Sequence, residues 1–212
     1  RSIPHPDPLP EGEGENGTNS LSRISERSII MNELCRLSAT AAVALLKQRK
    51  VSPLELIDAA AERIAETDSK LNALPTLCIE RAREHAQRLM REPRADPPAH
   101  YFYGLPIAVK DNTDVEGVRC TSGSRIYADR IAPASDIVVR RLEHNGALVV
   151  GKSNLPEFAA GGNTFNDVFG VTRNPWDTRM TPSGSSGGSA AALASGQVWL
   201  ATGGDFGGSI RT

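Results

Sequence analysis

The chain has 212 residues, of which 39% are hydrophobic and 23% charged, and its formal net charge is −1. This balance gives no reason to expect a polyanionic partner such as nucleic acid, and no apolar run is long enough to span a bilayer. The three cysteines are widely spaced and form neither a metal-binding pattern nor a disulfide framework. The composition predicts a soluble globular protein of the reducing cytoplasm.

The first 30 residues differ from the rest of the chain. The stretch RSIPHPDPLPEGEGENGTNS is rich in Pro, Gly and Glu and lacks apolar periodicity. Residues 1–30 are therefore predicted to be a disordered or non-native leader, with Met31 as a candidate for the native start. Residues 31–212 are expected to form the folded part.

The first third of the folded part is predicted to be helical. Ser38 can cap a helix that runs to about Lys47. A second helix begins after Ser52, with Pro53 at its first position and Glu55 placed to complete a capping box. A third helix is predicted over residues 79–91, before a Pro-rich loop.

After that loop, strands and helices alternate. The short apolar stretches at 105–110, 147–151 and 197–204 are typical of buried strands. A capped helix is predicted over 135–146 and an Ala-rich helix over 186–196. This alternation predicts an α/β layered sheet, on which the helical first third packs.

The stretch GALVVGKS, residues 146–153, fits the pattern of a phosphate-binding loop. Its middle residues are Ala, Leu, Val and Val, which favour a strand, and Pro156 follows too closely for a long helix to start there. A strand followed by a loop is the preferred interpretation. Nucleotide binding through Lys152 and Ser153 is the alternative from a different functional class.

Ser186 lies at the centre of a G-x-S-x-G pattern. In an α/β-hydrolase, this serine follows a strand, and the catalytic Asp and His come later in the chain. No strand is predicted before Gly184, and all four histidines lie upstream, at His5, His85, His100 and His144. A nucleophile elbow centred on Ser186 is therefore excluded by the order of the residues.

A lysine can replace histidine as the base that activates a serine. Lys110 ends a predicted buried strand, where loss of hydration favours its neutral, proton-accepting form. Ser209 follows a strand and two glycines in GGDFGGSIR, where small residues let several backbone N–H groups converge on a developing oxyanion. This combination favours Ser209 as the nucleophile.

Taken together, these residues resemble the amidase signature family, from about Leu34 to the last residue. Four stretches carry the resemblance, in the family's order: GLPIAVKDNTDVEGVRCTSGS, GALVVGKSNLPEFA, FGVTRNPWD and PSGSSGGSAAALASG…LATGGDFGGSIR. The resemblance implies an α/β/α layered fold with a mixed central sheet. Because family domains are about twice as long, the chain is expected to be truncated and incomplete at its C-terminus.

The resemblance implies a Ser–Ser–Lys triad, in which Lys110 is the base, Ser185 the bridging serine and Ser209 the nucleophile. It also implies a cis peptide bond next to Ser185. The remaining implied residues are the oxyanion-hole amides of Phe206, Gly207, Gly208 and Ser209, and the supporting side chains Ser186, Asp205 and Arg211. One departure is Gly204, where many members have Thr.

The resemblance implies hydrolysis of a carboxylic acid amide through an acyl-enzyme, without a cofactor or a metal. The expected partner is a small-molecule amide, with neither nucleic acid nor membrane bound directly, and a homodimer of the full-length form is left open. The A-type subunit of a tRNA-dependent amidotransferase and an inactive remnant are the alternatives within the family. Trp176 and Trp199 are expected to be packing residues.

Overall fold

The computed structural model describes residues 33–211. The predicted leader, residues 1–30, lies outside the described part of the chain. The first helices are α2 (Ala39–Lys47), α3 (Pro53–Leu71) and α4 (Ile79–Arg91). Ser38 accepts a hydrogen bond from the Ala41 amide, and Ser52 and Glu55 form a complete capping box, so both predicted helix starts are confirmed.

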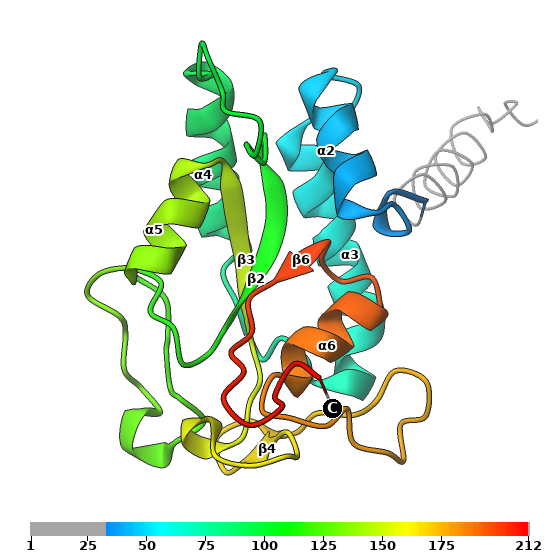
Figure 1. The fold of residues 1–212 in the computed structure, drawn as a ribbon, viewed down its shortest axis with the longest axis vertical. Helices are drawn as coiled ribbons and strands as arrows, with labels where there is room; N and C mark the ends of the chain where they lie inside the picture. Colours follow the sequence, from blue (N-terminus) through cyan, green and yellow to red (C-terminus); the bar gives the residue numbers. More distant parts are fainter. Residues whose placement is uncertain (1–32, 212) are drawn as a thin grey trace, which may run out of the picture.

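A four-stranded sheet forms the centre of the fold (Figure 1). Its strands are β1 (Thr76–Leu77), β2 (Leu105–Lys110), β3 (Ala147–Ser153) and β6 (Leu200–Ala201), in the order β1-β3-β2-β6. β2 is parallel to both β3 and β6, whereas β1 is antiparallel to β3. The predicted mixed central sheet is therefore confirmed.

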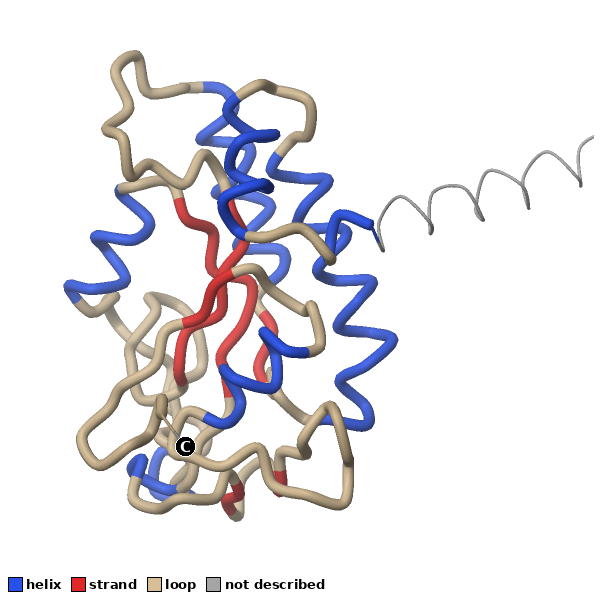
Figure 2. The backbone as a smooth tube through the Cα atoms, turned by 45° about the vertical axis from the view of Figure 1, so that its right-hand side comes forward, coloured by secondary structure: helices blue, strands red, loops and turns tan. Residues whose placement is uncertain are grey.

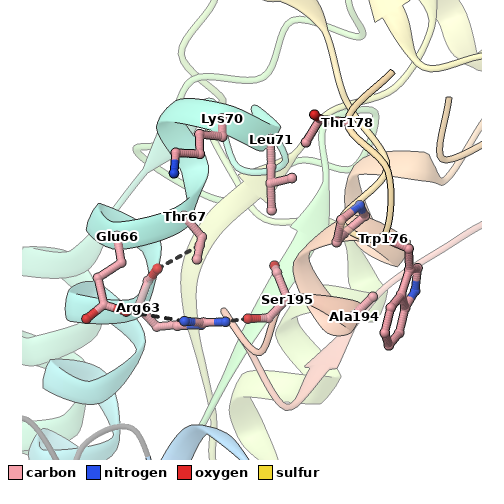
Figure 3. A pocket seen from close by; sticks show the side chains of 10 residues that line it. Arg63, Glu66, Thr67, Lys70, Leu71, Trp176, Thr178, Ala194 and Ser195 are labelled. Atoms are coloured by element: carbon pink, nitrogen blue, oxygen red, sulfur yellow. Dashed lines mark hydrogen bonds and ion pairs between the residues drawn. The ribbon is translucent and has the colours of Figure 1, made fainter. Parts of the chain in front are cut away.

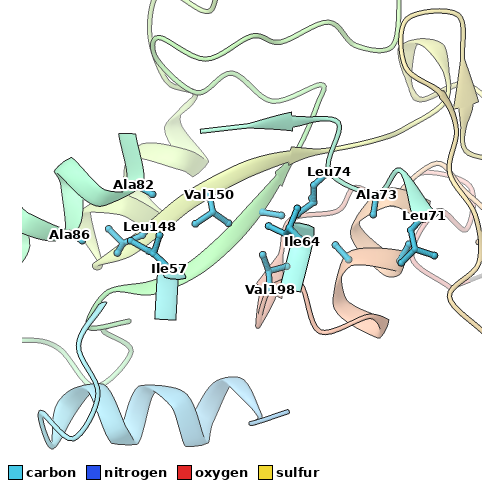
Figure 4. Close-up of a cluster of buried hydrophobic side chains, with 13 residues drawn as sticks. Ile57, Ile64, Leu71, Ala73, Leu74, Ala82, Ala86, Leu148, Val150 and Val198 are labelled. Atoms are coloured by element: carbon cyan, nitrogen blue, oxygen red, sulfur yellow. The ribbon is translucent and has the colours of Figure 1, made fainter. Parts of the chain in front are cut away.

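Helices cover both faces of this sheet, which Figure 2 shows as the red strands between blue helices. α3, α4 and the helix α6 (Gly187–Ala194) bury their apolar side chains against one face, in the cluster of Figure 4. The helix α5 (Ile137–His144) packs on the other face through Val139. α2 packs on α3 and reaches the sheet through Leu105. The arrangement is an α/β/α layered fold.

Several elements differ in length from those predicted. β6 pairs with β2 only at Leu200 and Ala201, not over 197–204, because the chain turns and bends between the end of α6 and Leu200. β3 continues two residues further than predicted, to Ser153. The short strands β1, β4 (Phe165–Asn166) and β5 (Gly170–Val171) were not predicted, because two residues carry no periodic pattern.

The stretch that fits a phosphate-binding loop is the strand β3 together with the turn before it. Its Lys152 is completely buried, with an exposed fraction of 0%, and no helix begins at Ser153. The preferred interpretation as a strand is confirmed, and nucleotide binding through this motif is excluded. None of the helices described in residues 33–211 combines the length and the hydropathy needed to cross a membrane.

Candidate active site

Three segments far apart in the sequence meet at one end of the sheet. Lys110 is the last residue of β2, Ser185 precedes α6, and Ser209 lies in the loop that follows β6. β2, β3 and β6 are parallel, so their carboxyl ends lie at the same edge, which is where open α/β sheets place their ligands. Figure 1 shows the loop after β6, in red, returning beside α6 at this edge.

The three predicted residues form a continuous hydrogen-bonded line. Lys110 Nζ donates to Ser185 Oγ at 2.7 Å, and Ser185 Oγ donates to Ser209 Oγ at 3.0 Å. The peptide bond between Gly184 and Ser185 is cis, as the resemblance implied. The structure therefore brings Lys110, Ser185 and Ser209 together in the order expected for a proton relay.

Lys110 is almost fully buried, with an exposed fraction of 2%. Because burial disfavours the charged ammonium, it lowers the pKa of Lys110 to about 8. A larger fraction of Lys110 is then neutral near pH 7 than of an exposed lysine. A neutral amine has a lone pair that can accept the Ser185 proton, which an ammonium group lacks.

Ser186 contacts both Lys110 and the loop that carries Ser209. Its Oγ accepts a hydrogen bond from Lys110 Nζ at 2.9 Å and donates to the carbonyl oxygen of Gly204 at 3.2 Å. The amide of Gly204 also donates to Ser186 Oγ, at 3.3 Å. Ser186 thus connects the lysine to the loop that carries Ser209.

Asp205 organises the loop around Ser209. Its carboxylate accepts hydrogen bonds from the amide of Gly208 at 2.7 Å and from the Arg211 guanidinium at 2.8 and 2.9 Å. The hydrogen bond from Arg211 holds the pKa of the Asp205 carboxyl well below its usual range. Asp205 and Arg211 therefore lie in the loop of Ser209 and bond to each other.

The contact between Gly208 and Asp205 corrects one sequence-based expectation. The Gly208 amide was expected to face an oxyanion, but its hydrogen is already bonded to the Asp205 carboxylate. Within residues 33–211, the amides of Phe206, Gly207 and Ser209 make no hydrogen bond. The Phe206 side chain is fully exposed.

A small hollow of about 230 Å³ opens beside Ser209, between α6 and the loop after β6. Its walls carry the apolar side chains of Ala190, Leu193, Ala201 and Ile210, and no charged side chain lines it. The site therefore has room for a small uncharged group next to the proposed nucleophile.

A second hollow, of about 270 Å³, lies between α3 and the loop before α6, and Lys110, Ser185 and Ser209 are not among its lining residues (Figure 3). Trp176 stands at its edge and is 86% exposed, so the expectation that Trp176 packs in the core is wrong. Trp199 is 7% exposed and donates from Nε1 to the Leu34 carbonyl, so the expectation is confirmed for that residue.

Two polar clusters that sequence reasoning missed support the edge of the sheet. Ser189 of α6 bonds to Ser153 of β3 at 2.6 Å and donates to the Thr202 carbonyl at 2.8 Å. Asp111, the residue after Lys110, forms a buried ion pair with Lys152. Polar residues at the ends of apolar strands were the available signal. Among the described residues, no three His, Cys, Asp or Glu side chains form a group that could hold a metal ion.

With the geometry in place, comparison with known proteins decides the family. The family model described as Amidase matches residues 55–212. The chain belongs to the amidase family. The resemblance found in the sequence is thereby confirmed.

Three proteins illustrate these similarities. The A-type subunit of glutamyl-tRNA(Gln) amidotransferase from Anaeromyxobacter dehalogenans (strain 2CP-C) is 44% identical over 179 residues, covering 84% of this chain and 36% of that protein. An amidase family protein from Bacillus anthracis str. Ames has a TM-score of 0.79 at 28% identity, over 92% of this chain and 40% of that chain. The structure of 6-aminohexanoate cyclic dimer hydrolase has a TM-score of 0.75 at 30% identity, over 84% and 35%. The chain spans about a third of the length of the curated relatives it matches.

Proposed function

We propose that the chain carries the catalytic site of an amidase, which hydrolyses a carboxylic acid amide to the acid and ammonia or an amine. The observation that carries the proposal is the hydrogen-bonded line from buried Lys110 through Ser185 to Ser209. Such a line joins a nucleophile to a base that burial has made partly neutral. Membership of the amidase family supports the same reaction.

In the proposed first step, Ser209 Oγ attacks the carbonyl carbon of the amide. The Ser209 proton passes to Ser185, and the Ser185 proton passes to the lone pair of Lys110. Neutral Lys110 keeps its orientation in this step, because an N–H still donates to Ser186. The product of the step is a tetrahedral intermediate with a negative oxygen.

In the second step, the C–N bond breaks and the leaving nitrogen takes a proton from Ser185, which Lys110 replaces. This leaves an acyl ester on Ser209 and a neutral lysine. Water then attacks the ester through the same relay, and the acid is released. The sum is amide plus water giving acid plus ammonia or an amine.

The negative oxygen of the intermediate requires hydrogen-bond donors at its position. The amides of Phe206, Gly207 and Ser209 are the proposed donors, because they make no other hydrogen bond in the part of the chain that the structure describes. Gly208 is left out of this set because Asp205 already accepts its hydrogen. Asp205 instead fixes the shape of the loop that presents these donors.

The A-type subunit of a tRNA-dependent amidotransferase is the second candidate. Relatives named as the A-type subunit of glutamyl-tRNA(Gln) amidotransferase, at 44% identity, favour it. The two candidates share the proposed chemistry and differ in the amide: the second would release ammonia from glutamine and work with partner subunits. The uncharged lining of the hollow beside Ser209 fits a simple aliphatic amide better than the charged groups of glutamine.

Release of ammonia tests the proposal and separates the candidates. The purified chain is incubated with glutamine or with butyramide, and ammonia is measured for the wild type, Ser209→Ala and Ser69→Ala. Ser69 is an exposed serine on α3 and serves as the matched control. We expect release from butyramide, unchanged in Ser69→Ala and lower by roughly 10³-fold or more in Ser209→Ala.

Release from glutamine alone would favour the second candidate. The proposal is wrong if Ser209→Ala retains the activity, or if the folded wild-type chain releases ammonia from neither amide.

A further inference from the structure

Beside the proposed triad, two opposite charges are buried where the mechanism does not use them. Asp111 and Lys152 both have an exposed fraction of 0%, and Lys152 Nζ lies 3.2 Å from Asp111 Oδ1. Removing two charges from water is costly unless they are paired and hydrogen-bonded. Lys152 belongs to the motif that imitates a phosphate-binding loop, so its burial calls for another role.

Each polar atom of Asp111 has a hydrogen-bond or ion-pair partner. Its Oδ2 accepts hydrogen bonds from the amide and the hydroxyl of Thr121, at 3.1 and 2.5 Å. Its amide donates to the Ser153 carbonyl at 3.1 Å, and its carbonyl accepts from the Ser122 amide at 3.0 Å. These contacts fix the backbone immediately after Lys110.

The register of the sheet separates the ion pair from the proposed relay. Lys110 pairs with Ser153, whose hydroxyl bonds to Ser189 of α6, so Lys110 and Ser153 point to the α6 face. Successive residues of a strand point to opposite faces. Lys152 therefore points to the α5 face, where it meets Asp111. Asp111 follows Lys110 directly in the chain, so the ion pair lies on the opposite face of the sheet from the proposed relay.

The other ionisable groups nearby do not balance the charge of the Asp111 carboxylate, which leaves Lys152 as its counter-charge. Burial raises the pKa of Cys78 and of Cys120 to about 11, so both thiols are neutral near pH 7. Asp114 is paired with Arg130 through two hydrogen bonds. On the face of Lys110, the charged groups of the Ser209 loop are Asp205 and Arg211, which pair with each other. α6 carries no ionisable side chain.

We propose that Lys152 is a positioning residue for Lys110: through Asp111 it anchors the end of β2 and cancels the carboxylate charge next to the proposed base. An unbalanced Asp111 carboxylate would stabilise a proton on Lys110. With the balance, burial alone sets the pKa of Lys110, to about 8. The inference rests on the proposed function, because Lys110 needs to be neutral only if it acts as the base.

Nuclear magnetic resonance of lysine tests the inference without requiring activity. The chain has five lysines, at positions 47, 50, 70, 110 and 152, so side-chain Cε labelling gives a simple spectrum. The Lys110 signal is assigned by its loss in Lys110→Met. Its pKa is then measured in the wild type, Lys152→Met, Asp111→Asn and the double variant.

The two single variants are expected to move the pKa of Lys110 in opposite directions. Lys152→Met leaves the Asp111 carboxylate unbalanced and raises it by about one unit, whereas Asp111→Asn leaves the Lys152 cation unbalanced and lowers it by a similar amount. The double variant is expected to match the wild type. A purely structural role would shift both single variants in the same direction.

An unchanged Lys110 pKa in both single variants would overturn the inference, as would shifts of equal sign. Should Lys152→Met fail to fold, comparison of Asp111→Asn with the double variant provides the same test. The double variant must then have a higher Lys110 pKa than Asp111→Asn. Replacing both charges of a buried pair is usually better tolerated than replacing one. Failure of the proposed function is separate: it appears as loss of Ser209 reactivity with the Lys110 shifts intact.

Discussion

Lys110 is the residue whose charge decides the pH dependence of the proposed reaction. The base must be neutral to accept the Ser185 proton, and burial lowers its pKa to about 8. The reactivity of Ser209 is therefore expected to rise with pH, by about tenfold per unit below pH 8, and to level off above it. The rate of Ser209 labelling by a fluorophosphonate, measured from pH 6 to 10, checks this. A rate that falls through this range would contradict it.

Gly204 is a residue at which this chain departs from many members of the family it resembles. A Cβ built there would meet nothing within 4 Å, and its φ is not in the left-handed region. Gly204→Thr is therefore expected to leave the free energy of unfolding within about 0.5 kcal/mol of the wild type. Because Gly204 bonds to Ser186 through both its peptide groups, the labelling rate is expected to change while the pH midpoint does not. A shifted midpoint would show that the loop sets the charge of Lys110.

Some of the residues of the candidate site can be predicted from the sequence alone. Lys110 and Ser209 follow from the chemistry of a buried lysine and a glycine-rich turn. Ser185 follows only from the family resemblance, because nothing local distinguishes it from Ser186. The pairing of Lys152 with Asp111 depends on the register of β2 and β3, so it requires the structure.

Among the elements, α6 determines where Ser185 lies, and its glycine-rich start lets it approach β3. A Cβ on Gly188 would lie 2.3 Å from the Asn154 amide nitrogen and 2.5 Å from the Asn154 carbonyl oxygen. Gly188→Ala is therefore expected to destabilise the fold by about 1–3 kcal/mol and to slow Ser209 labelling, because the helix must move away from β3.

Gly204→Ala is the matched control for Gly188→Ala, since its Cβ has open space. Chemical denaturation of both variants provides the measurement of stability, and the labelling rate of Gly188→Ala is compared with that of the wild type. Equal stability of the two variants would show that α6 does not pack as closely on β3 as the structure indicates.

The helices and strands that can be predicted from the sequence are those whose signals lie within one segment. α3 and α4 were predicted because caps, Pro53 and helical periodicity act within one segment. β2 was predicted with its observed bounds because it is buried on both faces and entirely apolar up to Lys110. β1 and β6 are strands of two residues, and such short strands are defined by their partners rather than by their own residues.

For the molecule as a whole, stability depends on the core between α3, α4, α6 and the sheet (Figure 4). Ile57 lies in this core with an exposed fraction of 0%. Ile57→Ala is expected to lower the free energy of unfolding by about 2–5 kcal/mol, through lost burial and the cavity that remains.

Ile126 is 77% exposed, so Ile126→Ala is the matched control and is expected to change the stability by less than about 0.5 kcal/mol. Denaturation in urea measures both variants. A loss in Ile57→Ala no larger than that in Ile126→Ala would mean that this cluster does not form the core.

Covalent labelling of Ser209 examines the proposed site as assembled by this chain. The purified protein is treated with a fluorophosphonate, and its intact mass is compared with those of Ser209→Ala and Ser186→Ala. The proposal predicts one adduct per chain, mapped to Ser209, absent in Ser209→Ala and still formed in Ser186→Ala. An adduct on Ser186, or none on the folded wild-type chain, would contradict the assignment of Ser209 as a nucleophile activated by Lys110 and Ser185.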